Sequence, residues 1–215
     1  MARFWFRGKT AAEELDRALG GCVTDIPIGK ARYTMLLNDN GGILDDLILY
    51  RKAENAIFMV VNAANRHVDR EHLLSRIDQT AFEDITEDGG GILALQGPQA
   101  PRILKELTGQ KDLAPGFLDL DWPQSPFGEL FIARTGYTGE MGYEIFVNAE
   151  QALPVWERLL ELGTTAVGLG ARDVLRLEAG LALYGHEIHE GITPFDAGLR
   201  FAIRGWKARN FIGGD

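Results

Sequence analysis

The stretch A-R-Y-T-M-L-L-N-D-N-G-G-I-L-D-D-L-I-L-Y-R, residues 31–51, decides the fold that the rest of the chain completes. Two largely apolar runs, Ala31–Leu37 and Ile43–Arg51, flank the polar turn Asn38–Gly42. Because Asn-Gly ahead of a β-type run is a hairpin signal, the stretch predicts two antiparallel strands. A third strand is expected at Ala56–Val61, after a short polar connection, so the hairpin should extend into a sheet.

Outward from this hairpin, a similar order of predicted strands and helices occurs in each half of the chain. The first half has a strand at Arg3–Arg7, a helix at Ala11–Leu19 capped by Thr10, the strands above, and a helix at Asn65–Ile77 capped by Asn65. The second half has a strand at Ile92–Gln96, a helix at Ala100–Leu107, a hairpin of Glu129–Arg134 with Tyr143–Val147, and a helix at Glu150–Leu162. Val61-Asn62-Ala63 and Val147-Asn148-Ala149 each end a strand and lead into a helix.

This plan predicts an α+β fold of two similar strand–helix–hairpin–helix halves, a ferredoxin-like duplication. The halves are expected at about residues 1–88 and 89–163, and a helical and loop tail should occupy residues 164–215. Within the tail we expect a helix at Gly168–Leu183 and a single strand beyond Ile192.

Composition and charge limit the classes of protein to which the chain can belong. The 215 residues are 46% hydrophobic and 25% charged, which is ordinary for a soluble globular protein. The net charge of −9 does not suggest the basic face of a nucleic-acid binder or of a protein that docks on anionic membranes. Cys22 is the single cysteine, and no apolar run approaches the ~20 residues of a membrane span. We therefore expect a cytoplasmic protein with neither a nucleic-acid nor a membrane partner.

Carboxylate side chains stand among apolar residues at two places in the sequence. Asp45 and Asp46 stand in an otherwise apolar strand, where alternation sends one of them to each face. One must share a face with apolar residues, which is costly without a partner or a function; alternatively, both lie at an exposed hairpin end. Glu144 has similar apolar neighbours and suits a guanidine-like ligand edge. On the residues alone, a cross-strand ion pair with Arg134 is the favoured explanation of Glu144.

The tail offers weaker signals. Gly168-Leu169-Gly170 precedes a helix, as in phosphate-binding turns, but the third glycine of a dinucleotide fingerprint is replaced by Asp173. Arg172, at the start of this helix, suits either surface ion pairing or contact with an anion. The histidines of His186–Glu190 are three residues apart rather than four, so no zinc-protease motif is present, and we predict no metal site.

Five motifs together resemble the folate-binding region of the glycine cleavage T-protein (aminomethyltransferase) family. They are G-K-A-R-Y-T-M-L-L-N-D-N-G-G-I-L-D-D-L-I-L-Y (29–50), M-V-V-N-A-A-N (59–65), L-Q-G-P-Q-A (95–100), R-T-G-Y-T-G-E-M-G-Y-E (134–144) and G-L-G-A-R-D-V-L-R-L-E-A-G-L-A-L-Y-G (168–185). The resemblance covers essentially the whole chain, in order. It implies the T-protein folate-binding fold, without the family's N-terminal segment and C-terminal β-barrel.

The resemblance also implies a reaction and its residues. The reaction is tetrahydrofolate-dependent one-carbon transfer, with an aminomethyl group delivered on the lipoyl arm of an H-protein-like carrier. Asp46 takes the catalytic place beside the reactive folate nitrogens, where a carboxylate can stabilise developing positive charge. Glu144 would hold the pterin edge and Arg172 the folate side. The remaining pocket residues implied are Tyr33, Val60, Asn62 and Tyr137.

Two alternatives share this scaffold. One is a folate-binding but catalytically inactive fragment, and the other is a related folate-dependent demethylase. At His186–Glu190 the chain departs from the acidic stretch that is common in the family. The iron–sulfur assembly branch is disfavoured, because its cysteine motif lies near the end of this region, far from the position of Cys22.

Overall fold

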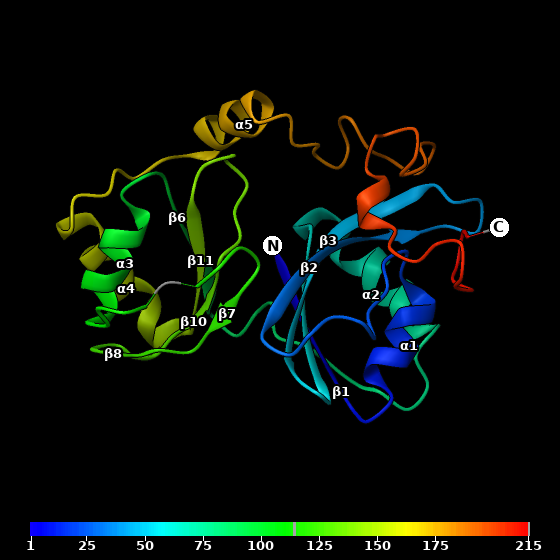
Figure 1. Cartoon of the computed structure of the whole chain (residues 1–215), viewed down its shortest axis with the longest axis horizontal. Coiled ribbons are helices and arrows are strands. Elements are labelled where there is room, and N and C mark those ends of the chain that lie inside the picture. Colours follow the sequence, from blue (N-terminus) through cyan, green and yellow to red (C-terminus); the bar gives the residue numbers. More distant parts are fainter. Residues whose placement is uncertain (114, 215) are drawn as a thin grey trace. The chain divides into compact units, whose positions relative to one another are not determined.

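The computed structural model describes residues 1–113 and 115–214. The chain forms two compact units (Figure 1). The first unit comprises Met1–Thr86 and Leu183–Asp215, and the second comprises Glu87–Ala182. The expected tail is therefore divided: residues 164–182 belong to the second unit, and residues 183–215 return to the first.

The first unit is built on a five-stranded antiparallel sheet of order β2-β3-β4-β1-β5. Its elements are β1 (Ala2–Arg7), α1 (Ala11–Ala18), β2 (Lys30–Leu37), β3 (Ile43–Ala53), β4 (Ala56–Val61), η1 (Ala63–Asn65), α2 (Arg66–Leu74), β5 (Ala81–Asp84) and η2 (Arg200–Ala202). The predicted hairpin is present, since β2 pairs antiparallel with β3 from Lys30 opposite Arg51 to Leu37 opposite Ile43.

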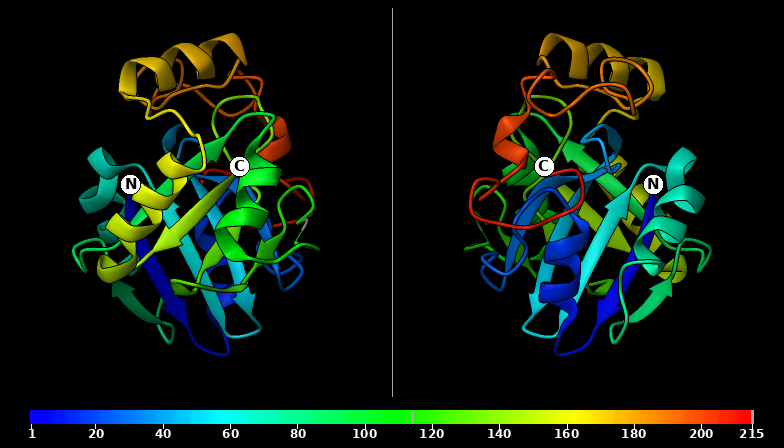
Figure 2. Two further views of the ribbon diagram at one scale, coloured as in Figure 1. Left: turned by 90° about the vertical axis from the view of Figure 1, so that its left-hand side faces the viewer. Right: turned by 90° about the vertical axis from the view of Figure 1, so that its right-hand side faces the viewer.

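Helices α1 and α2 cover one face of this sheet (Figures 1 and 2). The core of the first unit lies between these helices and the sheet. Leu15 and Leu19 of the α1 segment and Leu73 of α2 pack with Phe4 and Met59 of the sheet, all fully buried. Each such side chain removed from water contributes roughly 1.5–3 kcal/mol. The same alternation that buries these residues turns every second strand residue to the opposite face.

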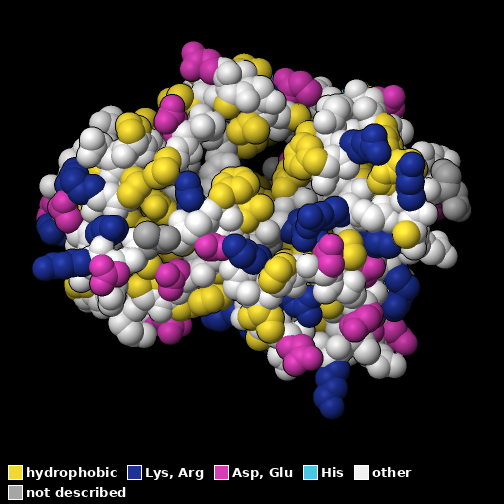
Figure 3. Space-filling view, in the orientation of Figure 1, with side chains coloured by type: hydrophobic (Ala, Val, Ile, Leu, Met, Phe, Trp, Pro, Cys, Tyr) yellow, Lys and Arg dark blue, Asp and Glu magenta, His cyan; other side chains and the backbone are white. Residues whose placement is uncertain are grey.

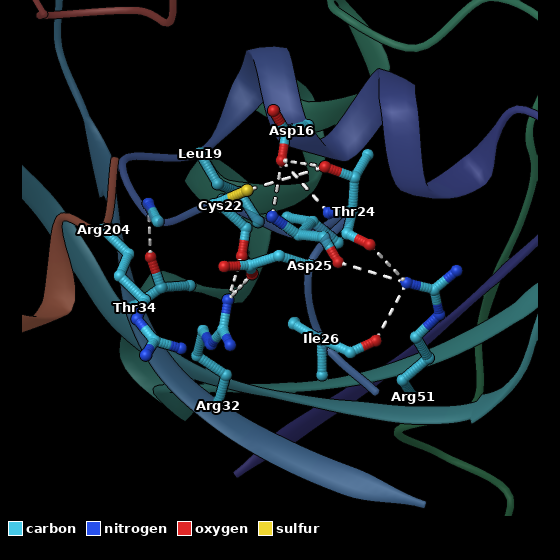
Figure 4. Close-up of polar contacts among 12 residues, drawn as sticks. Asp16, Leu19, Cys22, Thr24, Asp25, Ile26, Arg32, Thr34, Arg51 and Arg204 are labelled. Carbon is cyan, nitrogen blue, oxygen red and sulfur yellow. Dashed lines mark hydrogen bonds and ion pairs between the residues drawn. The ribbon is translucent and has the colours of Figure 1, made fainter. Parts of the chain in front are cut away.

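The loop that leads from α1 into β2 is held by charged side chains rather than by regular structure. Figure 4 shows Arg51 reaching the carbonyl oxygens of Thr24 and Ile26, both at 2.9 Å. Asp16 accepts the backbone N–H of Val23 and of Thr24. Because these contacts tie the loop to both α1 and β3, they fix where β2 enters the sheet.

The second unit has a four-stranded antiparallel sheet of order β6-β11-β10-β7, with helices α3 and α4 on one face. Its elements are β6 (Gly91–Gln96), α3 (Ala100–Thr108), β7 (Leu120–Asp121), β8 (Gln124–Ser125), β9 (Gly128–Glu129), β10 (Phe131–Ala133), β11 (Gly142–Val147), α4 (Ala149–Glu161) and α5 (Leu169–Glu178). The predicted hairpin of β10 and β11 is present, although Glu129 belongs to β9 and pairs with Gln124.

The tail predictions were wrong in two respects. The helix expected to reach Leu183 ends at Glu178, because Gly180 adopts φ +70°, a left-handed conformation that stops a helix. The strand expected beyond Ile192 does not form among the described residues that follow it, where the regular element is η2. Apolar residues of this segment, such as Ile203 and Phe211, are buried through turns instead.

Neither predicted cap accepts a hydrogen bond from its helix. The Thr10 hydroxyl donates to the Glu14 carboxylate at 2.9 Å, so it faces a side chain of α1 rather than a backbone N–H. The Asn65 amide donates to Leu44 O and to Asp45 Oδ1 in β3. A charged acceptor within reach competes with local capping for the same side chain.

Candidate functional site

Three of the expected site residues share the sheet face of the first unit that points away from α1 and α2. In the strand register, Tyr33 of β2 lies opposite Ile48 of β3, which lies opposite Val60 of β4. Asp46 is two residues before Ile48 and therefore points to the same side. Tyr33, Asp46 and Val60 are thus neighbours on one surface of the sheet.

Asp46 is mostly buried and has two donors. Tyr33 Oη donates to Asp46 Oδ2 at 3.0 Å, and Asn62 Nδ2 donates to Asp46 Oδ1 at 2.8 Å. Burial, followed by the charge of the adjacent Asp45, raises the pKa of Asp46, and the two donors oppose this rise. The result is a carboxyl group that is held in one orientation and poised nearer to neutral pH than an ordinary aspartate.

Asp45 points to the opposite, core-facing side and is fully buried. Its carboxylate accepts Asn62 N at 3.0 Å, Asn62 Nδ2 at 2.8 Å and Asn65 Nδ2 at 2.7 Å. The sequence prediction that one aspartate of the pair must enter an apolar face is confirmed. Asn62, at the end of β4, bonds both aspartates and so couples the two faces of the sheet.

The glycine turn ahead of β3 is closed by the returning tail. A Cβ atom on Gly42 would lie 1.8 Å from Glu190 O, so only glycine permits this approach. Ile43 N donates to Ile192 O at 3.0 Å in the same place. The segment between residues 184 and 192 therefore adjoins the aspartate pair, and burial together with Asp45 raises the pKa of Tyr184.

The second unit carries the other three expected site residues. Glu144 of β11 lies opposite Ala133 of β10 and Ala94 of β6, on the face away from α3 and α4. The Thr135 hydroxyl donates a hydrogen bond to Glu144 Oε2. The Arg172 guanidinium lies over the Tyr137 ring, 4.5 Å from its centroid, and Tyr137 Oη donates to Ala182 O. A cation–π contact of this kind orients both side chains.

Gln96 organises the loop that carries Tyr137. Its Nε2 donates to Thr135 O at 3.3 Å and to Tyr143 O at 3.1 Å, and its Oε1 accepts from the Thr138 hydroxyl at 3.3 Å. A Cβ atom on either flanking glycine of this loop, Gly136 or Gly142, would lie within about 2.2 Å of Gln96 Oε1. Gly136 and Gly142 therefore both pack closely against the amide of Gln96.

The seven expected residues thus form two groups, each described within its own unit. Tyr33, Asp46, Val60 and Asn62 lie together in the first unit; Tyr137 and Arg172 are in contact in the second, which also holds Glu144. The sequence analysis did not identify Asn65, Gln96 or Asp69 as buried or hydrogen-bonding residues that support the site. Of the three, Asp69 could have been found from the sequence pattern, because it precedes buried Leu73 by one helical turn and so falls on the core face of α2.

Metal clusters, membrane helices and surface charge bear on which ligands and partners the chain can have. Among residues 1–113 and 115–214, no three His, Cys, Asp or Glu side chains lie close enough to hold a metal ion. No helix in this described part is long and apolar enough to cross a bilayer. On the face shown in Figure 3, acidic and basic side chains are interspersed.

Comparison with known proteins places this geometry in a family. Residues 1–207 match the family described as the GCVT N-terminal domain. The chain belongs to the GCVT N-terminal domain family. Aminomethyltransferases of Streptomyces avermitilis and Rubrobacter xylanophilus are 42% and 41% identical to it; each alignment covers 99% of the chain but 59% and 57% of the relative.

A solved structure agrees with this membership. The crystal structure of the glycine cleavage system aminomethyltransferase T from Bartonella henselae superposes with a TM-score of 0.89 at 38% identity. It covers 99% of the chain and 58% of that protein. The chain therefore has the T-protein fold and spans somewhat more than half the length of the GCVT relatives it matches.

Proposed function

We propose that the chain carries the tetrahydrofolate site of an aminomethyltransferase and takes part in the one-carbon transfer of glycine cleavage. The relatives and the superposed structure named above are aminomethyltransferases, and they support the reaction class. The observation that carries the proposal is Asp46. It is a mostly buried carboxyl group with a raised pKa, held by Tyr33 and Asn62 on a sheet face turned away from the core.

The hydrogen-bonding chemistry of the two groups fits a reduced pterin. Its guanidine-like edge presents N–H donors, and Glu144 and Asp46 are acceptors that bind such donors strongly. A carboxylate offers about four lone-pair sites, so Asp46 retains acceptor capacity beyond its bonds to Tyr33 and Asn62. In this proposal Glu144 binds the pterin edge and Arg172 the folate side, and Val60, Asn62 and Tyr137 are further folate-binding residues.

The transfer balances without a redox partner. A lipoyl-S–CH₂–NH₂ group on an H-protein-like carrier loses its C–S and C–N bonds. The carbon forms two bonds to tetrahydrofolate nitrogens, and the two protons displaced from these nitrogens complete ammonia and the lipoyl thiol. Asp46 would orient the attacking nitrogen and stabilise the positive charge that develops on the carbon, which is electrostatic preorganisation.

We further propose that the two units arose by duplication. We also propose that the protein works in the cytoplasm. In both units the first strand pairs antiparallel with the last hairpin strand, β1 with β4 and β6 with β11. In both, that hairpin strand leads through an asparagine, Asn62 or Asn148, into a helical segment. A single, unpaired cysteine suits a reducing compartment.

Titration calorimetry of the chain with tetrahydrofolate tests the binding site. We expect saturable binding that Glu144→Gln weakens about 10- to 150-fold, the range of one charge-assisted hydrogen bond. Glu150→Gln, an exposed change of the same type, should leave the affinity unchanged. No binding by the folded chain would overturn the site, and an unaltered affinity in Glu144→Gln would remove that residue from it.

Transfer from a lipoylated, aminomethyl-loaded carrier tests the reaction. Asp46→Asn keeps the side-chain shape but removes the carboxyl group, so turnover should be lost while tetrahydrofolate still binds. Turnover equal to that of the wild type would refute the role of Asp46. Binding without any turnover in the wild type would make the chain a folate-binding protein only.

A further inference from the structure

Asp69 of α2 is a buried carboxyl group that the proposed function leaves without a role. Its side chain is fully enclosed in the first unit, on the helix face that also presents the core residue Leu73. An isolated charge in such a place is expensive, and real proteins avoid it by pairing or by neutralising the group. The chemical state of Asp69 is therefore set by its neighbours.

The neighbours of Asp69 supply no donor. Neither of its oxygens has a hydrogen-bond donor within reach among the described residues. Asn65 donates to Asp45 Oδ1 at 2.7 Å, and Asp69 lies one helical turn after Asn65, so the group that Asp69 can bond is the Asp45 carboxylate on β3. Asp45 already accepts three N–H bonds from Asn62 and Asn65, which favour its ionised form. Two carboxyl groups in contact cannot both ionise cheaply, so the proton resides on Asp69, the carboxyl group to which no N–H of the described chain donates.

We infer that Asp69 is a positioning residue, protonated in the folded chain, whose O–H donates to the Asp45 carboxylate and thereby fixes Asn62 and, through Asn62, Asp46. The bonds form one chain from α2 to the outer face of the sheet. The inferred Asp69–Asp45 bond is the first link. Asn62 Nδ2 supplies the others, because it donates to Asp45 Oδ1 and to Asp46 Oδ1, both at 2.8 Å. The consequence for Asp46 rests on the proposed function, whereas the proton on Asp69 does not.

The other titratable groups facing Asp69 are consistent with this arrangement. Burial, then the charge and hydrogen bond of Asp45, and then Asp46 raise the pKa of Asp69 to about 10. Tyr184, from the returning tail, faces the same carboxyl groups and has a raised pKa through burial, Asp45 and Glu190, so it stays neutral. These neighbours bring no cation that would ionise Asp69.

Infrared spectroscopy of the whole chain tests the proton. A protonated carboxylic acid has a carbonyl stretching band separate from those of carboxylates. We expect this band at pH 7 in the wild type and its loss in Asp69→Asn. The matched change Asp112→Asn, at an exposed position, should leave the band in place. Absence of the band in the wild type, or its persistence in Asp69→Asn, would overturn the inference.

A pair of variants tests the positioning role. Asp69→Asn keeps a donor toward Asp45, and Asp69→Leu removes it while keeping the branching at Cγ. The side-chain amide NMR signals of Asn62 should stay in place in the asparagine variant and shift in the leucine variant. The tetrahydrofolate affinity should be kept within about twofold in the first and fall about tenfold in the second.

The readouts separate the two proposals. If the wild-type chain does not bind tetrahydrofolate, the proposed function fails, while the infrared band and the Asn62 signals still decide the role of Asp69. If Asp69→Leu folds and leaves the Asn62 signals unmoved, the positioning role is refuted. If Asp69→Leu does not fold, rescue by Asp69→Asn decides: an asparagine variant that folds but has displaced Asn62 signals contradicts the inference.

Discussion

Replacing Asn62 by alanine should lower the free energy of unfolding of the first unit, and the hydrogen bonds of Asn62 set the size of the loss. Asn62 Nδ2 donates to Asp45 Oδ1 and to Asp46 Oδ1, both at 2.8 Å. A hydrogen bond to a charged group is worth about 1.5–3 kcal/mol, so two bonds set an upper value of about 6 kcal/mol. Asn62 is partly exposed, and water can replace part of this. We therefore expect a loss of about 2–4 kcal/mol, a large share of an ordinary domain stability of 5–15 kcal/mol.

Native-state hydrogen exchange measures this loss where it occurs. Because the chain has two units, amides of β3 and β4 should report the weakened first unit, and amides of β11 should exchange as in the wild type. Asn55→Ala, at an exposed position in the turn between β3 and β4, is the control and should change protection by less than about 0.5 kcal/mol. If Asn62→Ala changes β3 protection no more than this control does, the bridge between the aspartates contributes nothing measurable, and the reasoning fails.

Three further changes test other anchors. Glu14 accepts N–H bonds from residues 78–80, and these outweigh burial and lower its pKa to about 2. The stability they confer is therefore full above the ordinary carboxyl pKa and lost as pH falls toward about 2; Glu14→Gln should cost about 1–3 kcal/mol in urea unfolding at pH 7 and less at pH 3. Gln96→Ala should expose the 136–142 loop to limited proteolysis, whereas equal cleavage rates would contradict its anchoring role. Arg209→Ala removes bonds to Asp16 and to the carbonyl of Gly20, so exchange of residues 205–212 should quicken; unchanged exchange would show that the segment is held by its apolar contacts.

Local patterns predicted the elements whose hydrogen bonds are local. The hairpin of residues 31–51 follows from alternation and from a glycine turn in which Asn38 Oδ1 accepts Asn40 N and Gly42 N. The division of Asp45 and Asp46 between the two faces also follows from alternation alone. The roles proposed for Tyr33 and Asn62 came instead from the resemblance, because their hydrogen-bond partners lie 13 to 17 residues away in sequence.

The prediction failed where distant packing outweighs local preference. Asn65 is a good cap by residue type, yet its amide bonds the Asp45 carboxylate, a charged acceptor brought close by the fold. The apolar residues beyond Ile192 suggest a strand. They are instead buried in turns within the first unit, so no sheet pairing is needed to cover them.

The sequence by itself determined the antiparallel hairpins and the glycine-bounded carboxylate motifs, because each depends on residues close together in the chain. Only the tertiary structure decided that the tail divides between the units and that Asp69 adjoins Asp45. Burial and the choice of a hydrogen-bond partner depend on segments that meet in space, and a carboxyl group acquires its charge state only after such segments have excluded water from it.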